Sequence, residues 1–147
     1  MNSALSAKFT LWCCRLLALA VLAMIFFFPP LLRWYQALRN LSDTAALVVS
    51  IGFYLCVPVA LFALWSMDRL VTNILARQVF VEVNVRHIRR IRWCCAGVSL
   101  ICIVPACYYP PLALMVVIMA FLALVVSLVK NIMAAAVELR EENDLTI

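Results

Sequence analysis

The hydrophobic residues of this chain are gathered into long runs that charged residues hardly interrupt. The first run covers about residues 11–32, with Arg15 as its one interruption, and the second covers about 44–67 with no charge inside it. A helix needs about 20 apolar residues to cross a hydrocarbon core of about 30 Å. Both runs therefore predict membrane-spanning helices, and we interpret the first as a retained anchor rather than a cleaved signal.

A longer uncharged stretch in the second half of the chain breaks into two further runs, at about 93–109 and 111–129. Tyr108-Tyr109-Pro110-Pro111 lies between them. Because proline removes a backbone donor and clashes with the preceding turn, this double proline is a natural break. The pattern predicts a tight hairpin and an all-α fold of four transmembrane helices, a bundle with helical extensions on one side. The connecting loop is residues 68–92 and the tail is 130–147.

Composition supports the bilayer as the solvent of this chain. Hydrophobic residues make up 68% of the 147 residues and charged residues only 13%. Soluble domains carry about 45–50% apolar and about 25% charged residues. A soluble fold of this length leaves too much surface in water to hide the excess. We therefore expect residues 1–147 to form one membrane domain in contact with lipid.

The positions of the basic residues predict the orientation. Ten of the twelve Lys and Arg residues flank the runs on one side, in the amino-terminal segment, the loop and the tail. The other side carries Arg33 and Arg39. Cytoplasmic loops carry the excess of Lys and Arg in membrane proteins. The pattern favours a multi-pass protein of the bacterial cytoplasmic membrane, with both termini in the cytoplasm.

The loop contains apolar residues at helical spacing with arginines between them. We expect the second helix to continue past the membrane towards Phe80, and Asn84 to serve as the N-cap of the next helix, because its side chain can accept from a free backbone N–H. Arg69 and Arg77 lie in the first part of this loop. A turn of helix on the membrane surface and a dedicated binding segment both fit this pattern.

The tail is rich in good helix formers, so we expect the fourth span to continue as a helix. Its last residues, 144–147, alternate in a way that predicts a short extended strand. The loop and the tail carry opposite charges on the same side of the membrane. They form either an intramolecular clamp or a partner-binding surface, with these candidate residues: Asn84, Arg86, Arg89, Arg90 and Arg92 in the loop, and Glu138, Glu141, Glu142 and Asp144 in the tail.

Residues with catalytic or metal-binding patterns are scarce. His87 is the only histidine and lies among arginines, and the cysteines occur as adjacent pairs such as Cys13-Cys14 and Cys94-Cys95 rather than as C-x-x-C. Adjacent cysteines are not the spacing of a zinc or redox site. Cys13 and Cys14 lie near a membrane interface, where acylation is an alternative to simple packing. We expect a non-enzymatic protein without cofactor or metal, and no direct binding of nucleic acid.

Two segments resemble a known family. They are Phe80–Ile91, with the sequence FVEVNVRHIRRI, and Glu138–Ile147, with the sequence ELREENDLTI. With four spans in a short chain, they resemble the bacterial family catalogued as domain of unknown function 2975. The resemblance covers nearly the whole chain and implies two helix pairs around a cytoplasmic segment. It also implies a cytoplasmic partner, a small helix-turn-helix DNA-binding regulator.

Two functions are consistent with these features. The first is a membrane-bound regulatory or interaction protein that presents the arginine loop and the acidic tail to a cytoplasmic partner. The second is an oligomeric channel or export component, because kinked spans and hydrophobic gates need no charge. Association of several copies is open in either case.

Overall fold

The computed structural model describes residues 3–76 and 81–146, and these form four long helices and no strand. The helices are α1 (Ser3–Arg39), α2 (Asp43–Leu75), α3 (Glu82–Tyr108) and α4 (Pro111–Leu145). All four are long and apolar enough to cross a membrane. The predicted all-α fold with four membrane-spanning helices is confirmed.

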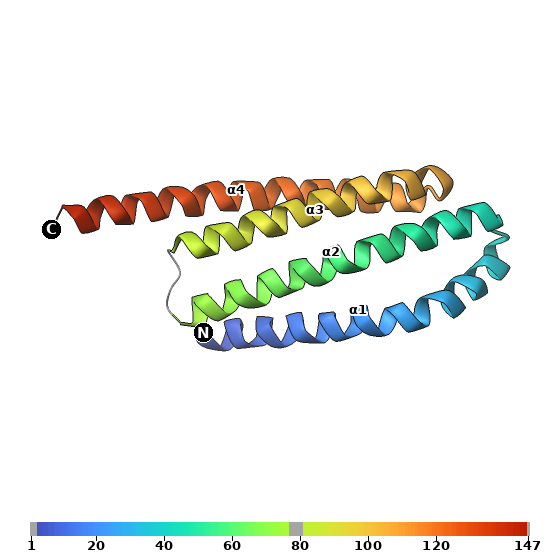
Figure 1. Ribbon diagram of the computed structural model, residues 1–147, viewed down its shortest axis with the longest axis horizontal. Coiled ribbons are helices and arrows are strands. Elements are labelled where there is room, and N and C mark those ends of the chain that lie inside the picture. The colour runs from blue at the N-terminus through green and yellow to red at the C-terminus, as the bar shows by residue number, and fades with distance from the viewer. Residues whose placement is uncertain (1–2, 77–80, 147) are drawn as a thin grey trace.

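The helices run antiparallel to their neighbours and lie in a row (Figure 1). The backbone of α1 contacts α2, α2 contacts α3, and α3 contacts α4, and no other two helix backbones meet in the described part of the chain. The start of α1, the end of α2, the start of α3 and the end of α4 lie at one end, and the two short turns lie at the other (Figure 1). We call these the loop end and the turn end.

The two inner helices, α2 and α3, together contain nearly all the buried side chains. Gly52 on α2 lies against Pro105 on α3. A Cβ atom added to Gly52 would come within 2.7 Å of the Pro105 side chain. Small residues allow helix backbones in membranes to approach closely. Glycine is rare in this chain, yet one of its two glycines lies at this contact, where a larger side chain would clash.

The two Pro-Pro pairs have different structural outcomes. Pro110-Pro111 breaks the chain as predicted, since α3 ends at Tyr108 and α4 begins at Pro111. At the start of a helix, the absent N–H of proline removes no bond. Pro29-Pro30, by contrast, lies inside α1, which continues to Arg39 beyond the predicted end of the first run.

A tyrosine on the neighbouring helix compensates for the first proline of this pair, Pro29. The N–H of residue 29 would normally donate to the carbonyl of Ile25, but Pro29 has no N–H. The hydroxyl of Tyr54 on α2 donates to that carbonyl oxygen at 3.4 Å. Phe28 stacks on Phe53 beside it, with ring centroids 3.8 Å apart. In lipid, groups from neighbouring helices satisfy the carbonyls that proline leaves free.

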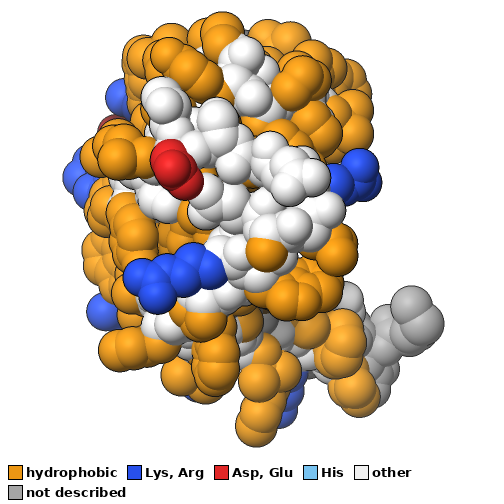
Figure 2. Space-filling model, turned by 90° about the vertical axis from the view of Figure 1, so that its right-hand side faces the viewer, with side chains coloured by type: hydrophobic (Ala, Val, Ile, Leu, Met, Phe, Trp, Pro, Cys, Tyr) orange, Lys and Arg blue, Asp and Glu red, His pale blue; other side chains and the backbone are white. Residues whose placement is uncertain are grey.

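Polar contacts close the turn end. Asn40 takes a left-handed conformation with φ 49°, and Ser42 caps α2 by accepting a bond from the N–H of Ala45. The hydroxyls of Tyr35 and Tyr109 share a hydrogen bond that joins α1 to the turn before α4. Figure 2 shows this end, where apolar side chains cover the flanks and few charged groups interrupt them.

Candidate interaction surface at the loop end

Three contacts fix how the helices are aligned along their length at the loop end. The Asn73 amide on α2 donates to the Asn84 side-chain oxygen on α3 at 2.9 Å. On α3, Arg92 donates to the hydroxyl of Ser127 on α4 at 3.4 Å. The third contact joins Arg15 on α1 to Asp68 on α2.

Counting residues from these contacts along the antiparallel helices places Arg15, Asp68, Arg89 and Lys130 at one level, one residue from each helix. Towards the turn end, each helix then has a stretch without any charged residue. These stretches are residues 16–32 of α1, 44–67 of α2, 93–108 of α3 and 111–129 of α4. At 1.5 Å per residue these stretches measure roughly 24–36 Å, against a hydrocarbon core of about 30 Å. The level marks the boundary of the membrane-spanning part.

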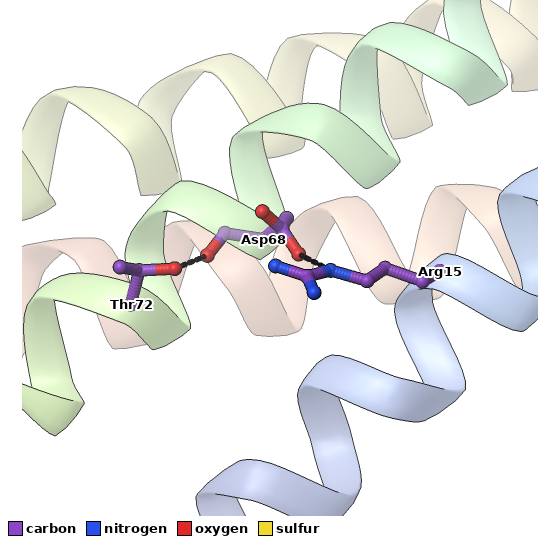
Figure 3. Close-up of polar contacts among 3 residues, drawn as sticks. All are labelled: Arg15, Asp68 and Thr72. Carbon is purple, nitrogen blue, oxygen red and sulfur yellow. Dashed lines mark hydrogen bonds and ion pairs between the residues drawn. The ribbon is translucent and has the colours of Figure 1, made fainter.

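The pair of Arg15 with Asp68 lies at this boundary (Figure 3). The guanidinium Nε atom lies 3.3 Å from the carboxylate oxygen, with the Arg15 side chain 70% exposed and that of Asp68 28%. Thr72 donates its hydroxyl to the backbone carbonyl of Asp68 at 2.7 Å. Arg15, which interrupts the first apolar run, thus meets an opposite charge. The sequence signal was present, because Asp68 is the acidic residue that directly follows the second run at the loop end.

Asn84 is a fully buried polar side chain of this surface, and the prediction that it is the N-cap of the next helix was wrong. It lies inside α3, which begins at Glu82 with Val81 as its N-cap. Its side chain has no exposed area and accepts from Asn73. A buried amide without a hydrogen-bond partner would cost free energy. The half-buried Asn73 therefore helps to explain how the Asn84 side chain is accommodated inside the interface. Asn73 was not among the predicted site residues.

His87 and Ser66 are also buried in this part of α2 and α3. The His87 ring meets Trp65 edge-on with centroids 6.2 Å apart. Neither the His87 Nδ1 atom nor the Ser66 hydroxyl has a hydrogen-bond partner among the described residues. Burial lowers the pKa of His87, and the nearby positive charges of Arg90, Arg69 and Arg86 lower it further. His87 is therefore a neutral imidazole at neutral pH.

The four candidate arginines do not share one environment. Arg86 and Arg89 are exposed, whereas Arg90 and Arg92 are half-buried. The guanidinium of Arg92 lies 5.2 Å from the centre of the Trp93 ring and also bonds Ser127. Arg92 therefore joins α3 to α4 at the membrane boundary, and Arg86 and Arg89 are the two that face solvent. Arg77 and Phe80 lie outside the described residues.

The acidic tail is helical as far as Leu145, so the prediction of a continued helix is confirmed. The prediction of an extended strand at 144–146 was wrong, because Thr146 has helical backbone angles after the helix end; Ile147 lies outside the described residues. The four carboxylates, those of Glu138, Glu141, Glu142 and Asp144, are all on exposed residues of α4.

The alignment of α3 with α4 separates these carboxylates from the arginines. From the contact of Arg92 with Ser127, Glu138 lies eleven residues towards the loop end and Arg86 only six. At 1.5 Å per residue, Glu138 is therefore about 7 Å beyond Arg86 along the axis, and the other carboxylates are further still. Figure 1 shows α4 projecting past the start of α3. Within the described residues, the loop arginines and the tail carboxylates form no ion pair.

Chemical groups for catalysis or metal binding are not gathered at this surface. No cluster of three His, Cys, Asp or Glu side chains suited to a metal ion occurs among the described residues. The seven cysteines are free thiols. Cys13 is half-buried and Cys14 is buried against α2, so of this pair Cys13 has the more accessible thiol.

The fold and the uncharged belt define a small, multi-pass, all-α membrane protein. Within that class, the sequence model of one family, described as "Protein of unknown function (DUF2975)", matches residues 8–147, and the chain belongs to this family. No curated protein and no solved structure matches the chain.

Proposed function

We propose that this protein is a non-enzymatic adaptor of the bacterial inner membrane that binds a cytoplasmic protein at its loop end. The excess of Lys and Arg at the loop end supports a cytoplasmic location for this end and for both termini. Only Arg33 and Arg39 flank the spans at the turn end.

The projecting end of α4 is the observation that carries this proposal. Its four exposed carboxylates and one arginine, Arg140, give it a net negative charge. Leu139 and Leu145 on the same projection are 64% and 88% exposed. A helix with exposed carboxylates and leucines suits a partner with a basic and partly apolar surface. Small DNA-binding regulators carry basic surfaces of this kind, and the family resemblance implies such a partner.

The part of the surface formed by α3 carries positive charge, opposite to that of the end of α4. Arg86 and Arg89 are exposed on α3, and Asn84 is held in place beneath them by Asn73. Charges arranged in this way determine partner choice and association rate more than affinity. We propose that the partner contacts α4 first and is oriented by the arginines.

Affinity purification from native membranes tests the proposal. The wild-type chain should retain a basic cytoplasmic protein, and Glu141→Lys combined with Glu142→Lys should reduce the retained amount at least about tenfold, because two reversed charges repel the partner. Arg39→Glu, a charge reversal at the turn end, is the matched control and should retain the partner fully. Equal retention by the tail variant, or no retained protein, would sink the proposal.

An oligomeric channel or export component is the second candidate. Its support is the row arrangement, which leaves long apolar faces of α1 and α4 exposed for packing on further copies. Vesicles containing the purified protein should then leak ions or small solutes in proportion to the number of copies. Vesicles that stay tight would remove this candidate without affecting the first.

A further inference from the structure

Two thiols face each other in the middle of the membrane-spanning part. Cys56 on α2 and Cys102 on α3 have their sulfur atoms 3.9 Å apart. Both side chains line an apolar cavity of about 190 Å³. The cavity lies next to the close contact of Gly52 with Pro105, which holds the two helices together at this point.

A third sulfur-containing residue lines the same cavity. Met115 on α4 contributes to its wall, together with apolar side chains from all four helices. Methionine has three rotatable bonds and a polarizable sulfur, so its thioether can turn towards the two thiols. The cavity thus offers three sulfur ligands from three helices and, among the described residues, no carboxylate or imidazole.

The ligand type selects the kind of metal. Thiolate and thioether sulfurs favour soft ions such as Cu⁺, whereas hard cations need oxygen ligands. Structural zinc sites take four ligands, and this cavity offers three sulfurs. The set fits a soft ion of low coordination number.

The charge of the bound state selects a monovalent ion. An isolated charge within the hydrocarbon region costs free energy. When Cu⁺ binds, it displaces one proton from one thiol, which leaves the site as H⁺, and the second thiol and the thioether bind as neutral ligands. The product carries no net charge and involves no oxidation or reduction. A divalent ion would need both thiols deprotonated to reach the same neutrality.

The observed sulfur separation agrees with this geometry. With metal–sulfur bonds of about 2.3 Å, two sulfurs on a trigonal ion lie about 4.0 Å apart. The thiols already have nearly that separation, at 3.9 Å. A disulfide would require the sulfurs to close to about 2.05 Å, which is a much larger movement within packed helices.

We propose that Cys56, Cys102 and Met115 form a binding site for a monovalent soft metal ion, Cu⁺ or its analogue Ag⁺. This site is independent of the proposed interaction surface, because it lies on the other side of the membrane boundary from that surface.

Titration of the purified, reduced protein with Cu⁺ against a chromophoric chelator tests the site. Five other cysteines would add background, so the measurement uses a variant that keeps only Cys56 and Cys102, with Cys13, Cys14, Cys94, Cys95 and Cys107 changed to alanine. This variant should bind one Cu⁺ per chain, and X-ray absorption should show sulfur neighbours at about 2.3 Å. Changing Cys102→Ala in it should abolish binding.

Met115→Leu keeps the volume and both thiols, so it tests the third ligand without disturbing the fold. We expect it to weaken Cu⁺ binding at least about tenfold while thermal unfolding of the metal-free protein is unchanged. Leu114→Met, on the neighbouring residue outside the cavity lining, is the matched control and should leave affinity unchanged. The proposal is overturned if the two-cysteine variant is folded but binds no Cu⁺, or if Met115→Leu binds as tightly as its parent.

Discussion

Single side chains hold the irregular points of this fold, and Tyr54 is the clearest case. Its hydroxyl donates to the Ile25 carbonyl, whose helical partner is lost at Pro29. Hydrogen bonds between helices in membranes contribute about 0.5–1.5 kcal/mol. The donor lost at Pro29 in α1 is therefore replaced by a residue on another helix.

We predict that Tyr54→Phe destabilises the protein by about 0.5–1 kcal/mol, measured by reversible unfolding in detergent. In a Pro29→Ala background the alanine N–H can bond to Ile25, so the same Tyr54→Phe change should cost almost nothing. A double-mutant cycle measures this difference. If the cost of Tyr54→Phe is equal in the two backgrounds, the hydroxyl does not replace the lost donor.

The two glycines give a matched pair for the α2–α3 contact. Gly52→Ala would place a Cβ atom 2.7 Å from Pro105, whereas Gly97→Ala meets nothing within 4 Å. Because overpacking forces backbone shifts, Gly52→Ala should destabilise by about 1–3 kcal/mol. Gly97→Ala should be neutral or stabilise by up to about 1 kcal/mol through helix propensity. Thermal unfolding of both variants checks the ranking, and equal melting temperatures would contradict it.

His87 gives the loop end a defined pH dependence. Burial and the neighbouring arginines lower its pKa below the unfolded value of 6.5. The folded state therefore favours the neutral ring, and the unfolded state binds more protons as the pH falls below about 6.5. Stability is fully present above that pH and is lost as the pH falls towards the lowered pKa.

We expect the unfolding temperature to fall between pH 7.5 and pH 5.5, and His87→Gln to remove a measurable part of that fall. Glutamine keeps a polar side chain of similar size without a titrating ring. A slope that is the same in wild type and His87→Gln would show that His87 carries no part of it.

At the scale of elements, the ends of the helices are where the sequence pattern was least informative. The runs of apolar residues predict four helices, because the hydrophobic stretch of a span is a local property. They do not show that α1 passes through Pro29-Pro30, since the compensating donor comes from Tyr54 on another helix. In the same way, Asn84 looks like an N-cap in sequence, but its partner Asn73 comes from α2.

The sequence predicts which residue types form the candidate surface, but not whether its arginines and carboxylates form ion pairs. Arginines in the loop and carboxylates in the tail follow from the sequence. Whether they meet depends on the alignment of α3 with α4, which the contact of Arg92 with Ser127 sets. That alignment carries Glu138 and the residues after it past the start of α3, so opposite charges on one side of the membrane do not by themselves make a clamp.

The projecting end of α4 leads to a prediction about stability. Residues 138–145 are exposed and form no ion pair with another helix in the described part of the chain. Removing residues 138–147 should change the free energy of unfolding by less than about 0.5 kcal/mol. A clamp would make the same truncation clearly destabilising, and the comparison by thermal unfolding separates the two interpretations.

At the scale of the whole molecule, the four helices share one membrane boundary and place the two charged ends on opposite sides. Asn40 lies in the exposed connection at the turn end, and Asn143 lies on the projecting part of α4. The two positions therefore report the two sides of the membrane.

We predict that, in a cysteine-free background, Asn40→Cys reacts with a membrane-impermeant maleimide in spheroplasts, whereas Asn143→Cys reacts only after the membrane is opened. The cysteine-free parent is the control and should stay unlabelled. Labelling of Asn143→Cys in intact spheroplasts would reverse the proposed orientation.

The helices are held together more closely at the turn end than at the loop end, and this difference has a mechanical consequence. At the turn end, two short connections and the bond of Tyr35 with Tyr109 hold the helices close, while at the loop end α4 projects alone (Figure 1). The helices can therefore tilt relative to one another about the turn end. Along a helix of 35 residues, about 50 Å long, a tilt of about 5° at the turn end displaces the far end by about 4 Å. Small rearrangements near the Tyr35–Tyr109 bond would thus be amplified at the projecting end of α4, where we propose that a partner binds.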